Sequence, residues 1–164
     1  MNNLEDIDIS IRDKSENPIQ LRTCGDGDFS CLLDMYEVFS PKPASQGLPP
    51  EDPETCECWA QNLLEIGMNL LVWREGKVIG HAAVVPDPGD KSGEFVIFVH
   101  QDFRNLGIGT KLTRVALEWA RKRVYDSIWL TVANTNFIAI KLYKKIGFAF
   151  SEMDAVERTM VIML

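Results

Sequence analysis

Hydrophobic residues recur along this chain with two different periods, and the change from one period to the other predicts a mixed α/β fold. The run Phe95–Val99 is apolar at every position, which is typical of a strand buried on both faces. Residues Ile128–Val132 alternate in polarity and predict a second strand. Between these strands an apolar residue returns every three or four positions, so we expect an amphipathic helix there. The stripe on this helix consists of Ile108, Leu112, Val115 and Trp119.

Further elements are expected on both sides of this unit. We predict helices within residues 25–39, 51–66 and 136–147, and strands near 19–24, 69–74, 77–85, 148–153 and 158–163. The pair Glu75-Gly76 favours a hairpin turn, and the Pro- and Gly-rich stretch 40–50 is a loop. Residues 1–17 form a polar N-terminal segment, either flexible or an edge strand, and residues 18–164 form a single domain.

The order strand, helix, strand, helix, strand from residue 94 onward predicts a right-handed crossover between two parallel strands. We expect these strands at the centre of a mixed sheet of six or seven strands, flanked by about four helices. Residues Thr159 to Leu164 are expected at an exposed edge of that sheet, which would favour a homodimer.

Composition narrows the range of functions. The 17 basic and 24 acidic residues give a net charge of −7, which argues against nucleic acid as the main partner, because phosphate binding requires a basic surface. No apolar run approaches the length of a membrane span, so we expect no membrane partner. The acidic start Met1–Asp6 lacks the pattern of a signal peptide, and we expect a cytoplasmic protein.

The four cysteines are Cys24, Cys31, Cys56 and Cys58. One C-x-C pair without a nearby histidine is a weak indication of a metal site. We therefore expect reduced thiols and no bound metal.

The segment Arg104–Gly109 carries two glycines between the apolar strand and the amphipathic helix. The first N–H groups of a helix have no partner within it, and the positive end of the helix dipole favours an anion. Glycine leaves room for a phosphate to approach these amides. The segment is not a dinucleotide fingerprint, because Leu112 replaces its third glycine, and it is not a P-loop, because Thr110 follows Gly109.

A second segment follows the strand at 128–132. Asn134 or Asn136 is suited to cap the start of a short helix, and Gly147 is suited to end it. Between the caps stands the pattern N-x-x-A-x-x-L-Y-x-x-x-G-F, which runs from Asn136 to Phe148.

Together the two segments resemble the GNAT acetyltransferase superfamily. Val99–Gly109 is similar to the acyl-CoA pyrophosphate loop of that family, and the pattern starting at Asn136 is similar to its second motif. The resemblance extends from about Leu70 to Phe150. Gln101 stands where the family often has Pro, and Asn105 where it often has Gly. Because the loop acts through backbone N–H groups and Asn tolerates the left-handed conformation, neither departure removes a required donor.

The resemblance implies a GNAT-type acyl-CoA N-acyltransferase fold whose central parallel strands splay apart near Val99 and Ala133. It also implies that the pantetheine arm of acetyl-CoA enters this gap and that the acetyl group moves directly to an amine. A backbone N–H near Phe98 or Val99 is expected to polarise the thioester carbonyl. The residues implied to bind the coenzyme are Ile97, Phe98, Val99, Arg104, Asn105, Leu106, Gly107, Ile108, Gly109, Thr110, Asn136, Ala139 and Tyr143.

Proton transfer requires an acid and a base. The resemblance implies Tyr143 as the general acid, seven residues after Asn136 on the same helix face. A base is required because an alkyl amine, with a pKa of about 10.4, is protonated at neutral pH. Glu94 is the first candidate for this base, His81 the second and His100 the third.

No motif names the acceptor. The Pro-rich loop 40–50 is the expected wall of its pocket, and small amines, amino acids, antibiotics and protein lysines or N-termini remain open as substrates. Two functions of other classes also remain open. One is a non-catalytic acyl-CoA-binding sensor or interaction domain, and the other is a nucleotide-binding protein that uses the same helix start.

Overall fold

One sheet of eight strands organises the part of the chain that the computed structural model describes, namely residues 6–41, 49–123, 125–153 and 156–164. The order of the strands across the sheet is β1-β2-β3-β4-β5-β6-β8-β7. Their bounds are β1 Asp8–Arg12, β2 Pro18–Thr23, β3 Met68–Arg74, β4 Lys77–Pro86, β5 Ser92–Val99, β6 Ser127–Ala133, β7 Ala149–Met153 and β8 Glu157–Met163.

All neighbouring strands are antiparallel except β5 and β6, which are parallel as predicted. The expected number of six or seven strands was too low. The N-terminal residues 8–12 form an edge strand against β2, and 77–86 and 92–99 form a hairpin. The predicted edge at Thr159 to Leu164 is wrong, because β8 lies between β6 and β7. The argument for a homodimer through that edge therefore fails.

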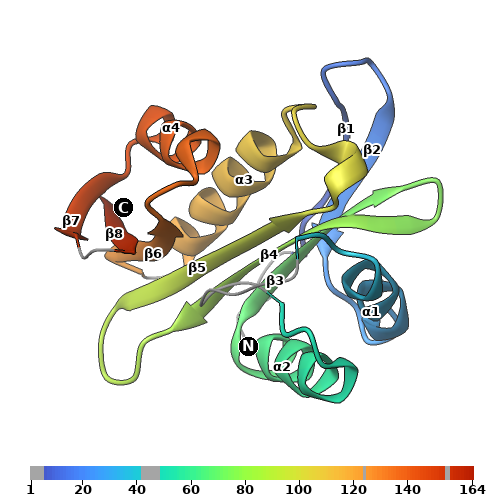
Figure 1. The fold of residues 1–164 in the computed structure, drawn as a ribbon, viewed down its shortest axis with the longest axis horizontal. Coiled ribbons are helices and arrows are strands. Elements are labelled where there is room, and N and C mark those ends of the chain that lie inside the picture. Colours follow the sequence, from blue (N-terminus) through green and yellow to red (C-terminus); the bar gives the residue numbers. More distant parts are fainter. Residues whose placement is uncertain (1–5, 42–48, 124, 154–155) are drawn as a thin grey trace.

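The helices of the described residues lie on both faces of the sheet (Figure 1). Their bounds are α1 Phe29–Glu37, α2 Pro53–Ile66, α3 Ile108–Lys122 and α4 Phe137–Ile146, with a 3₁₀ turn η1 at Gln101–Phe103. Helices α1 and α2 cover one face, and α3 and α4 cover the other. Most of the predicted acceptor loop, residues 42–48, lies outside the described residues.

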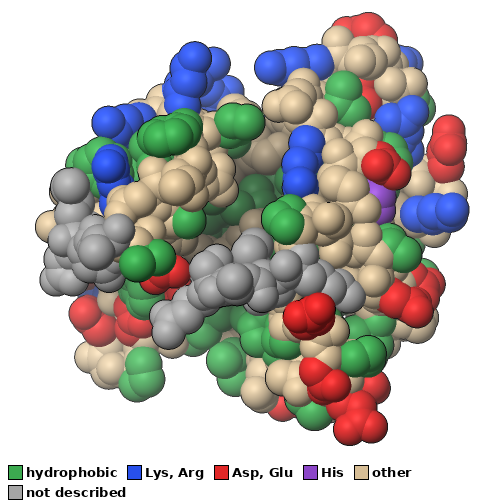
Figure 2. Space-filling view, viewed as in Figure 1, with side chains coloured by type: hydrophobic (Ala, Val, Ile, Leu, Met, Phe, Trp, Pro, Cys, Tyr) green, Lys and Arg blue, Asp and Glu red, His purple; other side chains and the backbone are tan. Residues whose placement is uncertain are grey.

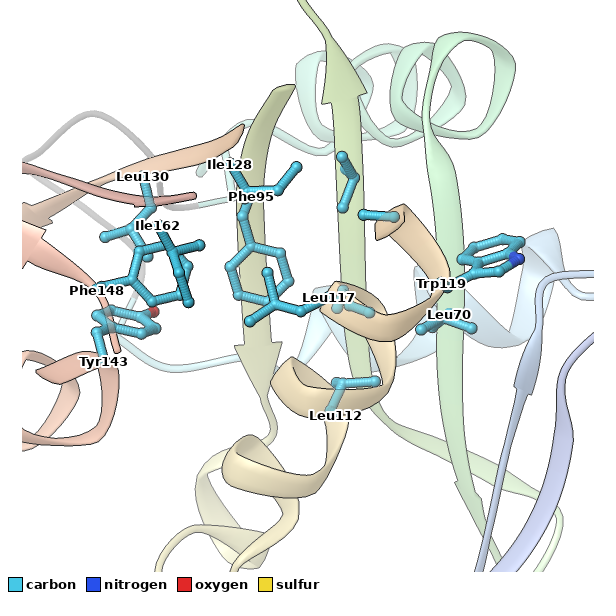
Figure 3. Packing of buried hydrophobic residues seen from close by; sticks show 14 of the residues in the cluster. Leu70, Phe95, Leu112, Leu117, Trp119, Ile128, Leu130, Tyr143, Phe148 and Ile162 are labelled. Carbon is cyan, nitrogen blue, oxygen red and sulfur yellow. The ribbon is translucent and has the colours of Figure 1, made fainter. Parts of the chain in front are cut away.

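The sheet separates two hydrophobic cores. The first core, between the sheet and α3 with α4, contains the predicted helix residue Ile108. It also contains Leu112 and Trp119 of the same stripe (Figure 3). Val115 lies at its border, and the small Ala116 occupies the centre of the contact instead. Burial of one leucine side chain contributes about 1.5–3 kcal/mol, so this stripe attaches α3 firmly to the sheet.

The second core lies between the sheet and α1 with α2. Strand β5 contributes to both cores, because Phe95 belongs to the first and Phe98 to the second. This confirms the prediction of a strand covered on both faces. Packing on both faces fixes the position of the end of β5, and of the loop that follows this strand, next to α3.

Candidate active site

A gap opens in the sheet between β5 and β6. The two strands pair only at Ser92–Ser127, Gly93–Ile128 and Glu94–Trp129. Beyond these positions β5 continues against β4, and β6 continues against β8. The splay therefore begins directly after Glu94, earlier along β5 than the predicted point near Val99.

The backbone of β5 presents unpaired polar groups to this gap. The amide of His100, which directly follows β5, donates to the carbonyl oxygen of Ile79 in β4 (2.9 Å). Because hydrogen-bonded positions alternate along an antiparallel pair, Phe98 also bonds with β4. Ile97 and Val99 therefore direct their N–H and C=O groups into the gap. Of the two positions expected for the polarising amide, Val99 directs its N–H into the gap and Phe98 bonds β4.

The opposite wall of the gap is built in the same way. The Leu164 amide donates to the carbonyl oxygen of Asp126 (2.9 Å), which sets the alternation between β6 and β8. Thr131 and Ala133 then direct their backbone groups away from β8 and toward β5. Both walls consequently carry the donors and acceptors that an extended, amide-containing ligand would need.

The loop at the end of β5 leads into a helix start whose first backbone amides have no acceptor in the described part of the chain. Among the described residues, no acceptor bonds the amides of Ile108, Gly109 and Thr110, and the first helical bond is donated by Lys111 to Gly107 (3.2 Å). Gly107 has no side chain to cap these amides. The start of α3 therefore has three free donors and the positive end of a helix dipole.

Two residues of the loop adopt the left-handed conformation. Asn105 has a φ of 64° and Gly107 a φ of 78°. The expectation that Asn105 tolerates such a turn is confirmed. Gly109 has no such constraint, and a Cβ there would point between α4 and β5, 3.4 Å from Leu142 Cδ1 and 4.0 Å from Val99 Cγ2.

The Arg104 guanidinium bonds the protein itself. Its Nε donates to the carbonyl oxygen of Val99 (3.1 Å), and its Nη2 donates to that of Ser40 (2.6 Å). The group lies 5.3 Å from the Phe39 ring, and burial lowers its pKa. These contacts hold Arg104 against β5 and residue Ser40, a structural role that the R-x-x-G-x-G pattern does not reveal.

Gln101, which departs from the family pattern, completes this link. Its Oε1 accepts from the Ser40 amide (3.0 Å), and its Nε2 donates to the carbonyl oxygen of Val38 (2.7 Å). Proline could make neither bond. Residues 38–40, which follow α1, are thereby tied to the loop that precedes α3.

Helix α4 brings Asn136 and Tyr143 to the same region. Asn136 Oδ1 accepts from the Ala139 amide (3.2 Å), which confirms the predicted cap and leaves the Nδ2 donors available. Tyr143 lies in the first core, with its ring 5.7 Å from that of Phe148 (Figure 3). The described residues offer its hydroxyl no hydrogen-bond partner. Burial raises the pKa of Tyr143 above its usual value, so the hydroxyl keeps its proton.

Glu94 lies at the apex of the gap. Its side chain lies on the face of the sheet opposite α3, because it alternates with Phe95 of the first core. Asp87 lies close to it, bonded to Trp129 Nε1 (2.7 Å). Partial burial and the negative charge of Asp87 raise the pKa of the Glu94 carboxyl, which makes it a stronger base than an exposed glutamate.

The structure encloses His81 in the protein interior. The side chain is fully buried, and burial lowers its pKa to about 3. Asn69 donates through Nδ2 to the carbonyl oxygens of Leu63 and Gly67, so its Oδ1 accepts from His81 Nε2 (2.8 Å). Nδ1 of His81 then accepts from the Tyr36 hydroxyl (2.5 Å). His81 is a neutral structural residue between α1, β4 and β3, which contradicts its place as second candidate base.

His100, the third candidate, caps the 3₁₀ turn η1. Its Nδ1 accepts from the Asp102 amide (3.2 Å), and its ring lies against Phe103. Glu94 is therefore the candidate that remains at the gap without a structural hydrogen-bonding role.

The C-x-C pair does not form a chelating site. Cys56 is buried in the second core and Cys58 is exposed, because residues two apart in a helix do not share a face. Among the described residues no group of three or more potential metal ligands occurs. None of the described helices is both long and apolar enough to cross a bilayer.

Figure 2 shows a hollow on this side of the molecule, with Lys and Arg side chains around its upper rim and hydrophobic side chains inside. It lies over α3, between α4 and the end of β5, as comparison with Figure 1 shows. The basic rim is local, since the whole chain is acidic. A ligand with an anionic end and an apolar or amide-rich arm fits this distribution.

Solved structures share this fold. The GNAT domain of S. lividans PAT superposes with a TM-score of 0.83 at 15% identity, over 96% of this chain and 97% of that one. The structure of yncA, a putative acetyltransferase from Salmonella typhimurium with its cofactor acetyl-CoA, has a TM-score of 0.70 at 17% identity, over 89% of this chain and 94% of that one. At these identities the likeness defines a GNAT-type fold and nothing further.

Sequence comparison supplies the family. Residues 32–148 match the Acetyltransferase (GNAT) family, and since this is more than half of the chain, the protein belongs to that family. It is 35% identical over 83 residues to the probable N-acetyltransferase camello of Xenopus tropicalis, which covers 49% of this chain and 37% of the relative. It is 44% identical over 52 residues to streptothricin acetyltransferase of Streptomyces lavendulae, covering 32% and 28%. The matches thus span less than half of these relatives.

Proposed function

We propose that the protein is an acetyl-CoA-dependent N-acetyltransferase that moves an acetyl group directly from the CoA thioester to a primary amine. The observation that carries the proposal is the gap between β5 and β6, which continues into the free amides at the start of α3. Coenzyme A presents a diphosphate, two amides and a thioester in sequence. The site presents groups in the same order, namely the free amides at the start of α3 and then the unpaired backbone of β5.

The protein groups that would hold this coenzyme follow from their positions. The amides of Ile108–Thr110 would bind the diphosphate, and the backbone of Ile97 and Val99 would bond the pantetheine amides as a neighbouring strand does. The Nδ2 of Asn136 is free for the same arm. A free N–H at Val99 or Ile97 would also stabilise the oxyanion that forms during acetyl transfer.

The acid and the base of this proposal lie on opposite faces of the sheet. Tyr143 is on the α4 side, where it can donate a proton or a hydrogen bond to the departing thiolate. Its raised pKa makes complete proton transfer to the thiolate less favourable, so Tyr143 contributes through a hydrogen bond to the departing sulfur. Glu94 is on the other side, which allows an amine to approach the thioester from the face opposite the coenzyme.

Glu94 acts at a distance from the reacting carbon. Ile97 is three residues further along β5, so the two are separated by roughly 10 Å along the strand. A carboxylate at that distance takes the amine proton through bound water. The acceptor itself is a primary amine of a small molecule or of a protein, and relatives are named for an antibiotic, for amino acids and for a ribosomal-protein alanine.

The decisive experiment is release of free thiol from acetyl-CoA in the presence of a panel of amines. The panel holds amino acids, polyamines, an aminoglycoside, a streptothricin and peptides with free N-termini or lysines. We expect release above background hydrolysis with at least one of these classes. Binding of CoA without release for any amine would indicate a non-catalytic binding domain. Displacement of CoA by ATP or NAD would indicate a nucleotide-binding protein.

A further inference from the structure

The turn between β1 and β2 is attached to the coenzyme loop. The Lys14 amide donates to the carbonyl oxygen of Leu106 (2.9 Å). From the other side, Lys111 Nζ in the first turn of α3 donates to the carbonyl oxygen of Arg12 (2.6 Å). An N-terminal hairpin is thus bonded to the residues on both sides of Gly107.

This turn is held in one conformation by a buried carboxylate. Asp13 is 3% exposed and accepts from the amides of Ser15 (2.8 Å) and Asn17 (3.1 Å). It also pairs with Arg74 of β3 at 3.4 Å. These hydrogen bonds keep the pKa of Asp13 below its usual value although burial opposes them. Lys14 therefore extends from a turn with a fixed backbone.

The side chain of Lys14 runs along Gly107. A Cβ on Gly107 would lie 3.2 Å from Lys14 Cγ and 3.3 Å from Lys14 Cε. Adding one C–N bond places the ammonium within roughly 6 Å of the Gly107 Cα. No acidic side chain among the described residues pairs with this ammonium. A positive charge without a partner thus lies beside the free amides of Ile108–Thr110.

From this juxtaposition we infer that Lys14 binds the diphosphate of coenzyme A, as a phosphate-binding residue supplied by the N-terminal hairpin. The inference rests on the proposed function, because it assumes that CoA occupies the start of α3. Helix amides alone leave much of a doubly charged diphosphate uncompensated, and an ammonium at salt-bridge distance adds charge without blocking the amides. Lys14 was not recognised in the sequence because about 90 residues separate it from the glycine loop.

The test compares ligand affinity in Lys14→Met, which keeps the aliphatic stem and removes the charge. Calorimetry with CoA, 3′-dephospho-CoA and pantetheine separates the phosphates, since 3′-dephospho-CoA retains the diphosphate and pantetheine has none. We expect about three- to fivefold weaker binding of both CoA and 3′-dephospho-CoA, as for one solvent-accessible ion pair, and unchanged binding of pantetheine.

Two variants serve as controls. Lys14→Arg should bind CoA within about twofold of the wild type, because it preserves the charge. Lys91→Met removes an exposed lysine at the opposite end of β5 and should leave the affinity unchanged. Thermal unfolding without ligand should be the same for all three variants, since both lysines are exposed.

Each contrary outcome has a distinct meaning. Wild-type affinity of Lys14→Met for CoA would overturn the role of Lys14 while leaving the proposed function intact. A loss seen with CoA and absent with 3′-dephospho-CoA would place the contact at the 3′-phosphate and overturn the assignment to the diphosphate. Failure of the wild-type protein to bind CoA would overturn the proposed function together with this inference.

Discussion

Replacing Gly109 by alanine distinguishes a glycine that serves the fold from one that leaves room for a coenzyme. Gly109 lies in the first turn of α3 with ordinary helical backbone, so alanine meets no conformational penalty there. The added methyl group would contact Leu142 at 3.4 Å and Val99 at 4.0 Å, which are normal van der Waals distances. Alanine is also the better helix former by up to about 1 kcal/mol. The free energy of unfolding should therefore stay the same or rise slightly.

The effect on the coenzyme should be the opposite. The methyl group points between α4 and the end of β5. The proposed function places the diphosphate bound to the amides of Ile108 and Thr110 in this space. Displacing that anion weakens at least one hydrogen bond to a charged group, which contributes about 1.5–3 kcal/mol. This corresponds to a loss of affinity for CoA of about ten- to 100-fold.

Urea unfolding without ligand and calorimetry with CoA measure the two quantities separately. Glu118→Ala is the matched control, because it places alanine on the exposed face of the same helix, away from the loop. Wild-type CoA affinity in Gly109→Ala would show that the coenzyme does not pass this surface. A marked loss of stability would refute the reasoning about the space around Gly109.

Three further predictions follow from the site and the core. Tyr143→Phe should slow turnover about 100-fold, the lower end of the usual range for acid–base catalysis, without changing the Kd for CoA, because only the hydroxyl is removed; unchanged turnover in a thiol-release assay would remove its role as acid. In the wild type, activity should rise with pH through the pKa of Glu94, which burial and Asp87 raise above its ordinary value, and Glu94→Gln should abolish this part of the pH profile; an unaltered profile would argue for another base. Burial gives His81 a pKa of about 3 in the folded protein, against an ordinary value of 6.5. Between these two pH values only the unfolded chain binds a proton at His81. The free energy of unfolding should therefore fall as the pH falls from 6.5 toward 3. The contribution is at most about 1.4 kcal/mol per pH unit. His81→Gln should remove it, as measured by urea unfolding at several pH values, and an equal pH dependence in both proteins would contradict the neutral buried state.

The sequence was sufficient for the elements that depend on local patterns. Helix α3 follows from its apolar stripe, and α4 is capped by Asn136 and Gly147 as predicted. The turn at Glu75-Gly76 has positive φ at both residues, as a tight hairpin requires. These features depend on a few neighbouring residues, so they can be predicted without knowledge of the fold.

The candidate site was predicted only in outline. The glycine loop and the parallel strands were located correctly, yet the sequence could not show that the Arg104 guanidinium bonds Val99 and Ser40. It also could not show that His81 is enclosed by Tyr36 and Asn69. A side chain's partners come from distant parts of the chain, and they decide whether a titratable group meets solvent, substrate or another polar group.

What the residues encode locally is the identity of each helix and strand and a glycine-rich helix start with free amides. What required the assembled sheet is the insertion of β8 between β6 and β7, the point at which β5 and β6 separate, and the approach of Lys14 to Gly107. Strand order and register are set by contacts between residues far apart in the chain. Because a shift of one residue moves every side chain of a strand to the other face, Ile97 and Glu94 acquire their places at the gap only when that register is established.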